Sequence, residues 1–212
     1  MTPRQSRREL VHARILEVCE TLFRGRGFEA TSIDDIAAGA EISRQTFFNY
    51  FSGKDAVLSA LAVAWLGRQA GLPRLDPADA RSWSVLGEAR RYVLAQARAI
   101  EADRDFMTLV IFHAGPGAPR GGSGGADGRR QRSDTARDIF SGVARILGAG
   151  QATGEVRSGV DPLRMAEVYV SAVLMTIQLW LLEPASGGES LESRVNAAVN
   201  VLEGGLRAGE SG

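Results

Sequence analysis

Apolar residues recur every three to four positions along almost the whole chain, the spacing that places them on one face of an α-helix. No segment keeps the alternation of apolar and polar residues that a half-buried strand requires. The pattern therefore predicts an all-α protein with about nine helices. Their expected ranges are residues 15–23, 32–39, 43–51, 54–71, 82–102, 104–113, 130–150, 161–179 and 189–206.

Residues that favour helix ends support these ranges. Ser32, Ser43 and Asp161 precede apolar-periodic segments and are good N-caps, because their side-chain oxygens can accept a hydrogen bond from the first helical turn. Pro162 suits the opening position of its helix, since it has no N–H to satisfy. Gly27 suits the end of the first helix.

Two breaks divide the helical pattern. Residues 72–77 contain Pro73 and Pro77, and we expect a small N-terminal domain to end near them. Residues 115–128 are rich in glycine, which predicts a loop, and they lack the Gly-Lys-Ser/Thr sequence of a phosphate-binding loop. The predicted division is an N-terminal domain at 1–55, a connecting helix and linker at 56–75, and a C-terminal domain at 76–212.

The second and third expected helices are separated by a tight turn at residues 39–42, the spacing of a helix-turn-helix. Alanines at 37, 38 and 40 supply the small residues needed where two such helices cross. The third helix has an apolar inner side, formed by Ile42, Phe47 and Phe51. Its other side carries residues that can bind base edges or thymine methyls in the major groove of DNA, namely Arg44, Gln45, Thr46, Phe48 and Asn49.

The overall charge does not favour nucleic-acid binding, because 25 basic and 25 acidic residues leave a net charge of zero. The distribution is less even. The first 14 residues hold one acidic residue, Glu9, against Arg4, Arg7, Arg8 and Arg14. This segment fits a phosphate-contacting arm and fits a solvated chain end equally well. Lys54 is the one lysine of the chain.

Cys19, the single cysteine, lies within an apolar helical pattern, and we expect it to be a small buried residue. One cysteine excludes a disulfide within the chain and favours a reducing, cytoplasmic setting. No apolar run reaches the ~20 residues of a membrane span, and residues 1–14 lack the apolar core of a secretory signal. No membrane association is expected.

The N-terminal region resembles the DNA-binding domain of the TetR family of transcriptional repressors over about residues 10–60. The helix caps, the turn and the third helix agree together, at Arg14-Ile15-Leu16, Leu22-Phe23, Gly27-Phe28, residues 31–37, Ile42-Ser43, residues 46–51 and Lys54-Asp55. The resemblance implies that Arg44 and Gln45 contact bases and that Thr31, Ser32 and Lys54 contact phosphates. It implies contacts to the DNA backbone or to base methyls for Thr46, Phe48 and Tyr50, and to a base or a phosphate for Asn49.

Two positions depart from the family pattern. Glu41 stands where the turn usually has glycine. We expect a positive φ there, at a cost of about 1 kcal/mol for a non-glycine residue, with the carboxylate pointing away from DNA. Phe48 stands where tyrosine is usual, so the hydroxyl contact to phosphate is lost.

The resemblance implies that residues 76–212 bind a small molecule and form a homodimer. The last two helices have apolar residues on more than one side, as expected when one side faces the protomer core and another faces a partner subunit. The expected dimer residues are Met165, Val168, Ala172, Leu179, Leu191, Val195, Ala198 and Leu202. The residues expected to line an apolar pocket with a few polar groups are Phe106, Phe112, His113, Phe140, Tyr169, Met175, Gln178 and Trp180. Plain core packing is the alternative for each of these.

The resulting hypothesis is a dimeric repressor that binds a palindromic operator in double-stranded DNA and is released by an unidentified, largely apolar effector. The helix at residues 54–71 would transmit the effect. A transcriptional activator needs the same DNA surface and stays an alternative, as do a helical protein-interaction module and an enzyme. No Ser-His-Asp, Cys-His, paired-carboxylate or metal-ligand pattern points to catalysis, so neither a metal nor a cofactor is expected.

Overall fold

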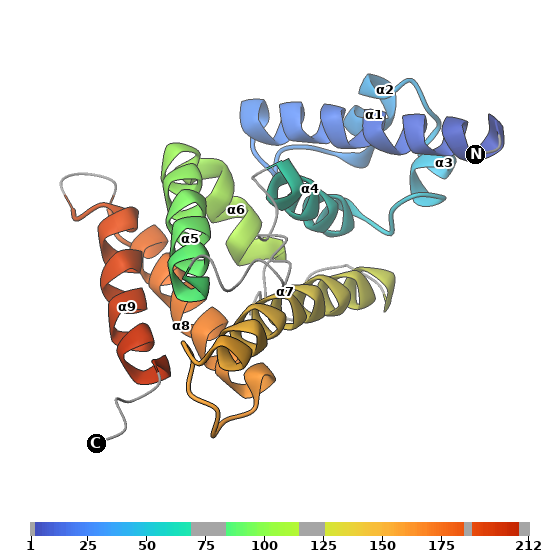
Figure 1. Ribbon diagram of the computed structural model, residues 1–212. Helices are drawn as coiled ribbons and strands as arrows, with labels where there is room; N and C mark the ends of the chain where they lie inside the picture. The colour runs from blue at the N-terminus through green and yellow to red at the C-terminus, as the bar shows by residue number, and fades with distance from the viewer. Residues whose placement is uncertain (1–2, 69–83, 115–125, 185–187, 208–212) are drawn as a thin grey trace, which may run out of the picture. The chain divides into compact units, whose positions relative to one another are not determined.

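The computed structural model describes residues 3–68, 84–114, 126–184 and 188–207. Within these ranges the chain is helical, and the one β-type pairing is an isolated bridge between Val156 and Arg207 (Figure 1). The all-α class predicted from the apolar pattern is confirmed. The helices are α1 (Pro3–Arg26), α2 (Ile33–Gly39), α3 (Arg44–Phe48), α4 (Lys54–Arg68), α5 (Val85–Ala102), α6 (Arg104–Ala114), α7 (Ala126–Thr153), α8 (Pro162–Leu182) and α9 (Leu191–Leu206).

Several helix ends lie where the capping residues predicted them. Ser32, Ser43 and Asp161 each accept a backbone hydrogen bond from the first turn of α2, α3 and α8. Pro162 is the first residue of α8. Gly27 follows α1 with φ 86°, a left-handed conformation that glycine adopts without steric cost.

Three boundaries differ from the prediction. Helix α1 begins at Pro3, so the basic N-terminal segment forms its first turns rather than a separate arm. Helix α3 ends at Phe48 instead of residue 51, and the Phe47 carbonyl then accepts both the Tyr50 N–H at 2.9 Å and the Phe51 N–H at 3.0 Å in the turn that follows. Helix α7 begins at Ala126, inside the predicted loop at 115–128. The first 11 residues of that loop and the predicted break at 72–77 lie outside the described ranges.

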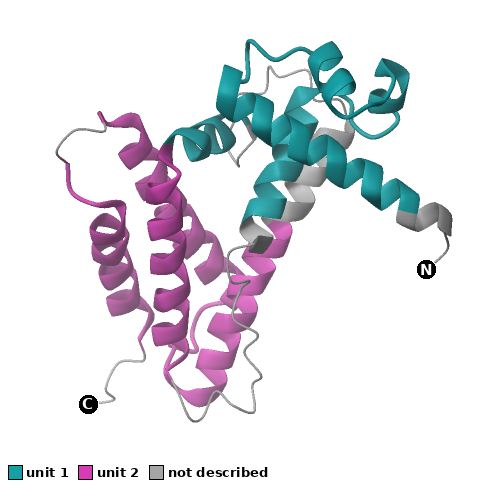
Figure 2. Ribbon diagram, turned by 90° about the horizontal axis from the view of Figure 1, so that it is seen from above, with its two compact units in different colours: residues 1–65, 105–134 teal, residues 66–104, 135–212 magenta. Residues whose placement is uncertain are grey.

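The chain forms two compact units (Figure 2). Unit 1 comprises Met1–Trp65 with Asp105–Asp134, and unit 2 comprises Leu66–Arg104 with Thr135–Gly212. In unit 1, the side chains with at most 1% exposure include Ile15, Cys19, Ile36, Phe47, Val57, Leu58 and Leu61. The burial predicted for Cys19 is confirmed.

Helix α6 contributes to unit 1 through two ring contacts near the end of α1. The Arg24 guanidinium lies 3.9 Å from the centre of the Phe106 ring, a cation–π contact. The His113 and Phe28 rings lie 5.2 Å apart, and Phe28 in turn packs edge-on against Phe23 at 5.0 Å. These contacts fasten α6 to the segment that leads into the helix-turn-helix.

In unit 2, α9 packs against both α5 and α8. A buried cluster formed by Leu86, Leu147, Val156, Met165 and Ala166 joins α5, α7 and α8. Gly150 is required for this approach, because a Cβ atom at that position would lie 2.5 Å from a methyl carbon of Val156.

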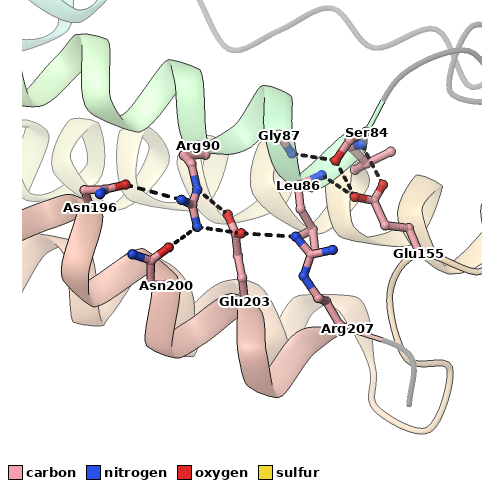
Figure 3. A network of polar contacts seen from close by, with 10 residues as sticks. Ser84, Leu86, Gly87, Arg90, Glu155, Asn196, Asn200, Glu203 and Arg207 are labelled. Atoms are coloured by element: carbon pink, nitrogen blue, oxygen red, sulfur yellow. Dashed lines mark hydrogen bonds and ion pairs between the residues drawn. The ribbon is translucent and has the colours of Figure 1, made fainter. Parts of the chain in front are cut away.

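A polar network links α5 to α9 (Figure 3). Arg90 donates to the Glu203 carboxylate from Nε at 3.2 Å and from Nη2 at 2.8 Å, and to the Asn196 amide oxygen at 3.3 Å. Glu203 is 4% exposed, and Arg207 lies 3.7 Å from its carboxylate. A separate carboxylate, that of Glu155, accepts the Val85 N–H at 2.6 Å and so satisfies the start of α5.

Helix α8 is long and apolar enough to span a membrane by length and composition, alone among the described helices, and 33% of that window is buried. Core helices pass the same test, so this is weak evidence for a membrane.

Candidate nucleic-acid interface

The turn between α2 and α3 has the geometry of a helix-turn-helix. The Ala40 N–H bonds to the Ile36 carbonyl at 2.9 Å, and the Ile42 N–H bonds back to the Ala37 carbonyl at 2.9 Å. Glu41 has φ 57°, the only positive φ at a non-glycine residue in the described part of the chain. The predicted positive φ is confirmed: the chain holds an exposed glutamate in a conformation that favours glycine. The direction of its carboxylate relative to DNA stays a prediction.

The N-terminal end of α2 is held by a capping box between Ser32 and Asp35. The Ser32 hydroxyl accepts the Asp35 N–H at 3.1 Å, while the Asp35 carboxylate accepts the Ser32 N–H at 2.9 Å and the Ser32 hydroxyl proton at 2.6 Å. These bonds from Ser32 lower the pKa of the Asp35 carboxyl below its usual range. The box fixes the first turn of α2, which includes Asp34.

The segment of residues 42–51, which contains α3, has an inner and an outer side, as the sequence predicted. Phe47 is fully buried and Phe51 is 5% exposed, with 6.1 Å between their ring centres. Ile42, the third predicted inner residue, is half-buried. The residues on the outer side are exposed at Arg44, Gln45, Phe48 and Asn49, and half-buried at Thr46 and Tyr50.

Two polar contacts tie the outer side of α3. Arg44 Nη1 donates to both carboxylate oxygens of Asp34 on α2, at 2.9 Å each. Gln45 donates from its amide nitrogen to the Asn49 amide oxygen at 3.5 Å, one helical turn away. The Arg44–Asp34 pair was not anticipated from the sequence, which predicted the outer position of Arg44 alone.

The residues predicted to bind phosphate differ in whether they have hydrogen-bond donors left for it. Thr31 is 1% exposed, its hydroxyl donates to the Gly27 carbonyl at 2.8 Å and its N–H to the Phe28 carbonyl at 3.3 Å. In this conformation Thr31 has no donor left for a phosphate, because both are used inside the domain. Lys54 donates from Nζ to the Phe28 carbonyl at 2.6 Å and lies 4.5 Å from the centre of the Phe28 ring. Lys54 therefore ties the start of α4 to the turn after α1, and its ammonium retains further protons for a phosphate.

One side of α1 lies beside the end of the α3 segment. The Arg8 guanidinium lies 5.9 Å from the Tyr50 ring centre, and the His12 ring lies 5.0 Å from the Phe51 ring. A hollow of about 310 Å³ is lined by Arg8, Glu9, His12 and Tyr50. Burial, and to a lesser degree the charge of Arg8, lowers the pKa of His12. His12 was not among the predicted residues, although its i, i+4 spacing from Arg8 places both on one face of α1.

The residues predicted to line an effector pocket are divided between the two units. Phe106, Phe112 and His113 belong to unit 1, where Phe106 and His113 contact the end of α1. The other five belong to unit 2, with Tyr169 and Trp180 buried, Phe140 and Gln178 half-buried, and Met175 exposed by 53%. Met175 therefore lies on the surface of the protomer. The pocket itself stays a prediction.

The residues predicted for the dimer interface also fall into two groups. Met165, Leu191 and Val195 are 5%, 0% and 0% exposed, so they belong to the core of unit 2 and are not available to a partner subunit. When a helix has apolar residues on two sides, the sequence alone does not show which side faces the core of the protomer. Val168 and Leu179 are exposed by 62% and 53%, and Ala172, Ala198 and Leu202 are half-buried.

Comparison with known proteins places the N-terminal region in a family. Residues 15–61 match the family described as "Bacterial regulatory proteins, tetR family". The HTH-type transcriptional regulator EthR of Mycolicibacterium smegmatis is 47% identical over 49 residues, which is 23% of this chain and 23% of that protein. An uncharacterized HTH-type transcriptional regulator, YfiR of Bacillus subtilis, is 28% identical over 152 residues, 71% of this chain and 70% of that protein. The match to EthR thus spans about a quarter of its length.

Among solved structures, the fold is similar to that of Thermus thermophilus FadR, described as a TetR-family transcriptional repressor in complex with lauroyl-CoA. The TM-score is 0.70 at 23% sequence identity, covering 94% of this chain and 97% of that one. Bacillus subtilis FadR, in complex with stearoyl-CoA, has a TM-score of 0.68 at 15% identity, covering 92% and 99%. At these identities the likeness concerns the fold. The helix-turn-helix region of this chain, residues 15–61, is thus similar to the DNA-binding region of TetR-family bacterial regulatory proteins.

Proposed function

We propose that this protein is a cytoplasmic transcriptional repressor that binds a palindromic operator as a homodimer and leaves it when a small molecule binds. The observation that carries the proposal is the two-sided α3. Phe47 on α3 and Phe51 shortly after it are buried in the core, while Arg44, Gln45 and Asn49 are exposed. Arginine, glutamine and asparagine are the side chains that read guanine and adenine edges in the major groove. An activator with the same DNA surface is the alternative.

Phosphate contacts would fix the orientation of the domain on DNA, while α3 reads bases. Ser32 is exposed at the start of α2, and it would have to exchange its hydroxyl bond to Asp35 for one to a phosphate. Lys54 keeps protons available beside Phe28. Thr46, Phe48 and Tyr50 would touch backbone or base methyls next to the bases read by Arg44. Arg8, above the Tyr50 ring, adds a positive charge to this side of the domain.

The exposed apolar side of α8 supports a homodimer. Val168, Met175, Leu179 and Leu182 are exposed by 53% to 68%, and with Ala172 they follow the alternating four- and three-residue spacing of helices that pack side by side. On α9, Val201 is 79% exposed. We propose that the same faces of a second subunit cover these residues, because a symmetric interface must match its own surface. Sedimentation velocity of a Leu179→Glu, Val201→Glu variant should then show a monomer.

The effector would carry a polar group on a largely apolar body. In unit 2, the Tyr169 hydroxyl and the Gln96 side-chain oxygen are buried and have no hydrogen-bond partner among the described residues. Buried polar atoms are rarely left unpaired, so a bound molecule or an ordered water is expected beside each. We propose that an effector supplies at least one of these partners.

Fluorescence anisotropy with the DNA upstream of the gene tests the repressor proposal. We expect specific binding to an inverted repeat, and expect Arg44→Ala with Gln45→Ala to weaken it at least tenfold. Both side chains are exposed, so the variant should keep the melting temperature and the dimer. Arg91→Ala is the matched control, because it removes an exposed arginine of unit 2. Failure of the protein to bind any palindromic site specifically would refute the proposal and favour a protein-interaction module.

A further inference from the structure

The Arg44 guanidinium is held from two sides. Asp34, on α2, accepts hydrogen bonds from one guanidinium nitrogen, with Nη1 2.9 Å from Oδ1 and 2.9 Å from Oδ2. The Phe48 ring, one turn along α3, lies 5.7 Å from Arg44 Cζ. A long arginine side chain therefore has a defined direction on an otherwise exposed surface.

This arrangement leaves a second edge of the guanidinium available. Both carboxylate oxygens bind Nη1, and no hydrogen-bond partner of Nε or Nη2 occurs in the described part of the chain. The Nε–Nη2 edge presents two parallel N–H donors, and two parallel donors match the O6 and N7 acceptors of guanine. The ion pair thus does not occupy the edge with which an arginine reads a base.

Stability does not explain the pair. The side chains of Arg44 and Asp34 are exposed by 58% and 70%, and ion pairs at such positions contribute little to folding. Asp34 is also not needed to cap α2, because Asp35 and Ser32 form the capping box. A carboxylate on the DNA-facing side of the domain should moreover repel phosphates, so its presence there calls for another role.

We propose that Asp34 is a positioning residue that aims Arg44 at a guanine in each operator half-site. Held at Nη1, Arg44 pays less entropy when it binds a base edge and is less free to bind a phosphate instead. The Asp34 charge also weakens binding to DNA of any sequence, so it raises specificity in two ways. The inference rests on the proposed DNA-binding function. It goes further by naming guanine as the base that Arg44 binds and Asp34 as the residue that makes Arg44 prefer it.

The test begins with selection of binding sites from a random double-stranded DNA pool by the wild-type protein. Fluorescence anisotropy then compares the affinity for the selected site with that for a site in which the guanine assigned to Arg44 is replaced by adenine in both half-sites. We expect wild type to discriminate about five- to 150-fold, the range of one bidentate base contact, and Arg44→Ala to lose that discrimination. Asp34→Ala and Asp34→Asn should reduce it at least fivefold while raising the affinity for unrelated DNA severalfold at low salt.

Glu29→Gln is the matched control, because Glu29 is an exposed acidic residue of the same domain with no ion pair among the described residues. It should leave the guanine preference unchanged. A merely structural role of Asp34 would lower the melting temperature and weaken all sequences alike. If the Asp34 variants keep the full guanine preference, or gain affinity equally for every sequence, the inference is refuted while the DNA-binding proposal stands. If wild type selects no sequence at all, the DNA-binding proposal itself fails.

Discussion

Replacement of Arg90 by methionine should destabilise unit 2 strongly, because it leaves a buried carboxylate with one distant partner. Glu203 is 4% exposed and accepts two hydrogen bonds from Arg90, whereas Arg207 lies 3.7 Å away and is itself 59% exposed. Breaking a buried ion pair by removing one partner costs about 3–5 kcal/mol. Since the Arg90 side chain retains 29% exposure, we expect the lower end, about 3 kcal/mol.

The double variant Arg90→Met, Glu203→Leu separates the cost of an unpaired charge from the loss of packing. Replacing both partners with apolar groups of similar volume is often close to neutral, so we expect the double variant to lie within about 1 kcal/mol of wild type. The two substitutions should therefore be strongly non-additive. Urea unfolding followed by circular dichroism gives the free energies, at one protein concentration so that any dimerisation contributes equally.

Arg91→Met is the control for this pair of variants. Arg91 is the neighbouring residue, 69% exposed, and its ion pair with Glu88 lies within α5. Its loss should change the free energy of unfolding by less than about 0.5 kcal/mol. A cost below 1 kcal/mol for Arg90→Met, or a double variant as unstable as the sum of the single ones, would refute the assignment of the network as the fastening between α5 and α9.

Three further predictions concern single residues. Burial raises the pKa of Cys19 to about 12, so Ellman's reagent should leave the folded protein unmodified at pH 8 and react only on unfolding. Burial and a neighbouring positive charge lower the pKa of His12 below 6.5, so the unfolded chain takes up its proton first. Stability should therefore decline as the pH falls below about 6.5, and His12→Gln should flatten the decline between pH 7.5 and 5.5 in urea midpoints. Gly150→Ala should destabilise by about 1–2 kcal/mol through its contact with Val156, despite better helix propensity, whereas Gly25→Ala, with open space at its Cβ, should stabilise slightly. Equal thermal shifts for the two alanine variants would contradict the close-packing explanation.

Local features of this protein could be predicted because their causes are local. The caps at Ser32, Ser43 and Asp161 need only a side-chain oxygen two or three residues before an N–H group. The positive φ at Glu41 was expected from the family resemblance, in which this turn position usually has glycine, and its φ of 57° agrees. The burial of Phe47 and Phe51 follows from the period of the helix.

The sequence by itself thus determined the helical class, the helix-turn-helix and the two sides of α3, since each depends on neighbours along the chain. Only the tertiary structure decided that Lys54 reaches the carbonyl of Phe28, 26 residues earlier, and that Asp34 takes hold of Arg44. It also decided that Met165 and Val195 face the core while Val168 and Leu179 stay exposed. The physical reason is that helical periodicity marks the apolar sides of a helix without saying which neighbour covers each side, and a charged side chain selects its partner only after distant segments have packed together.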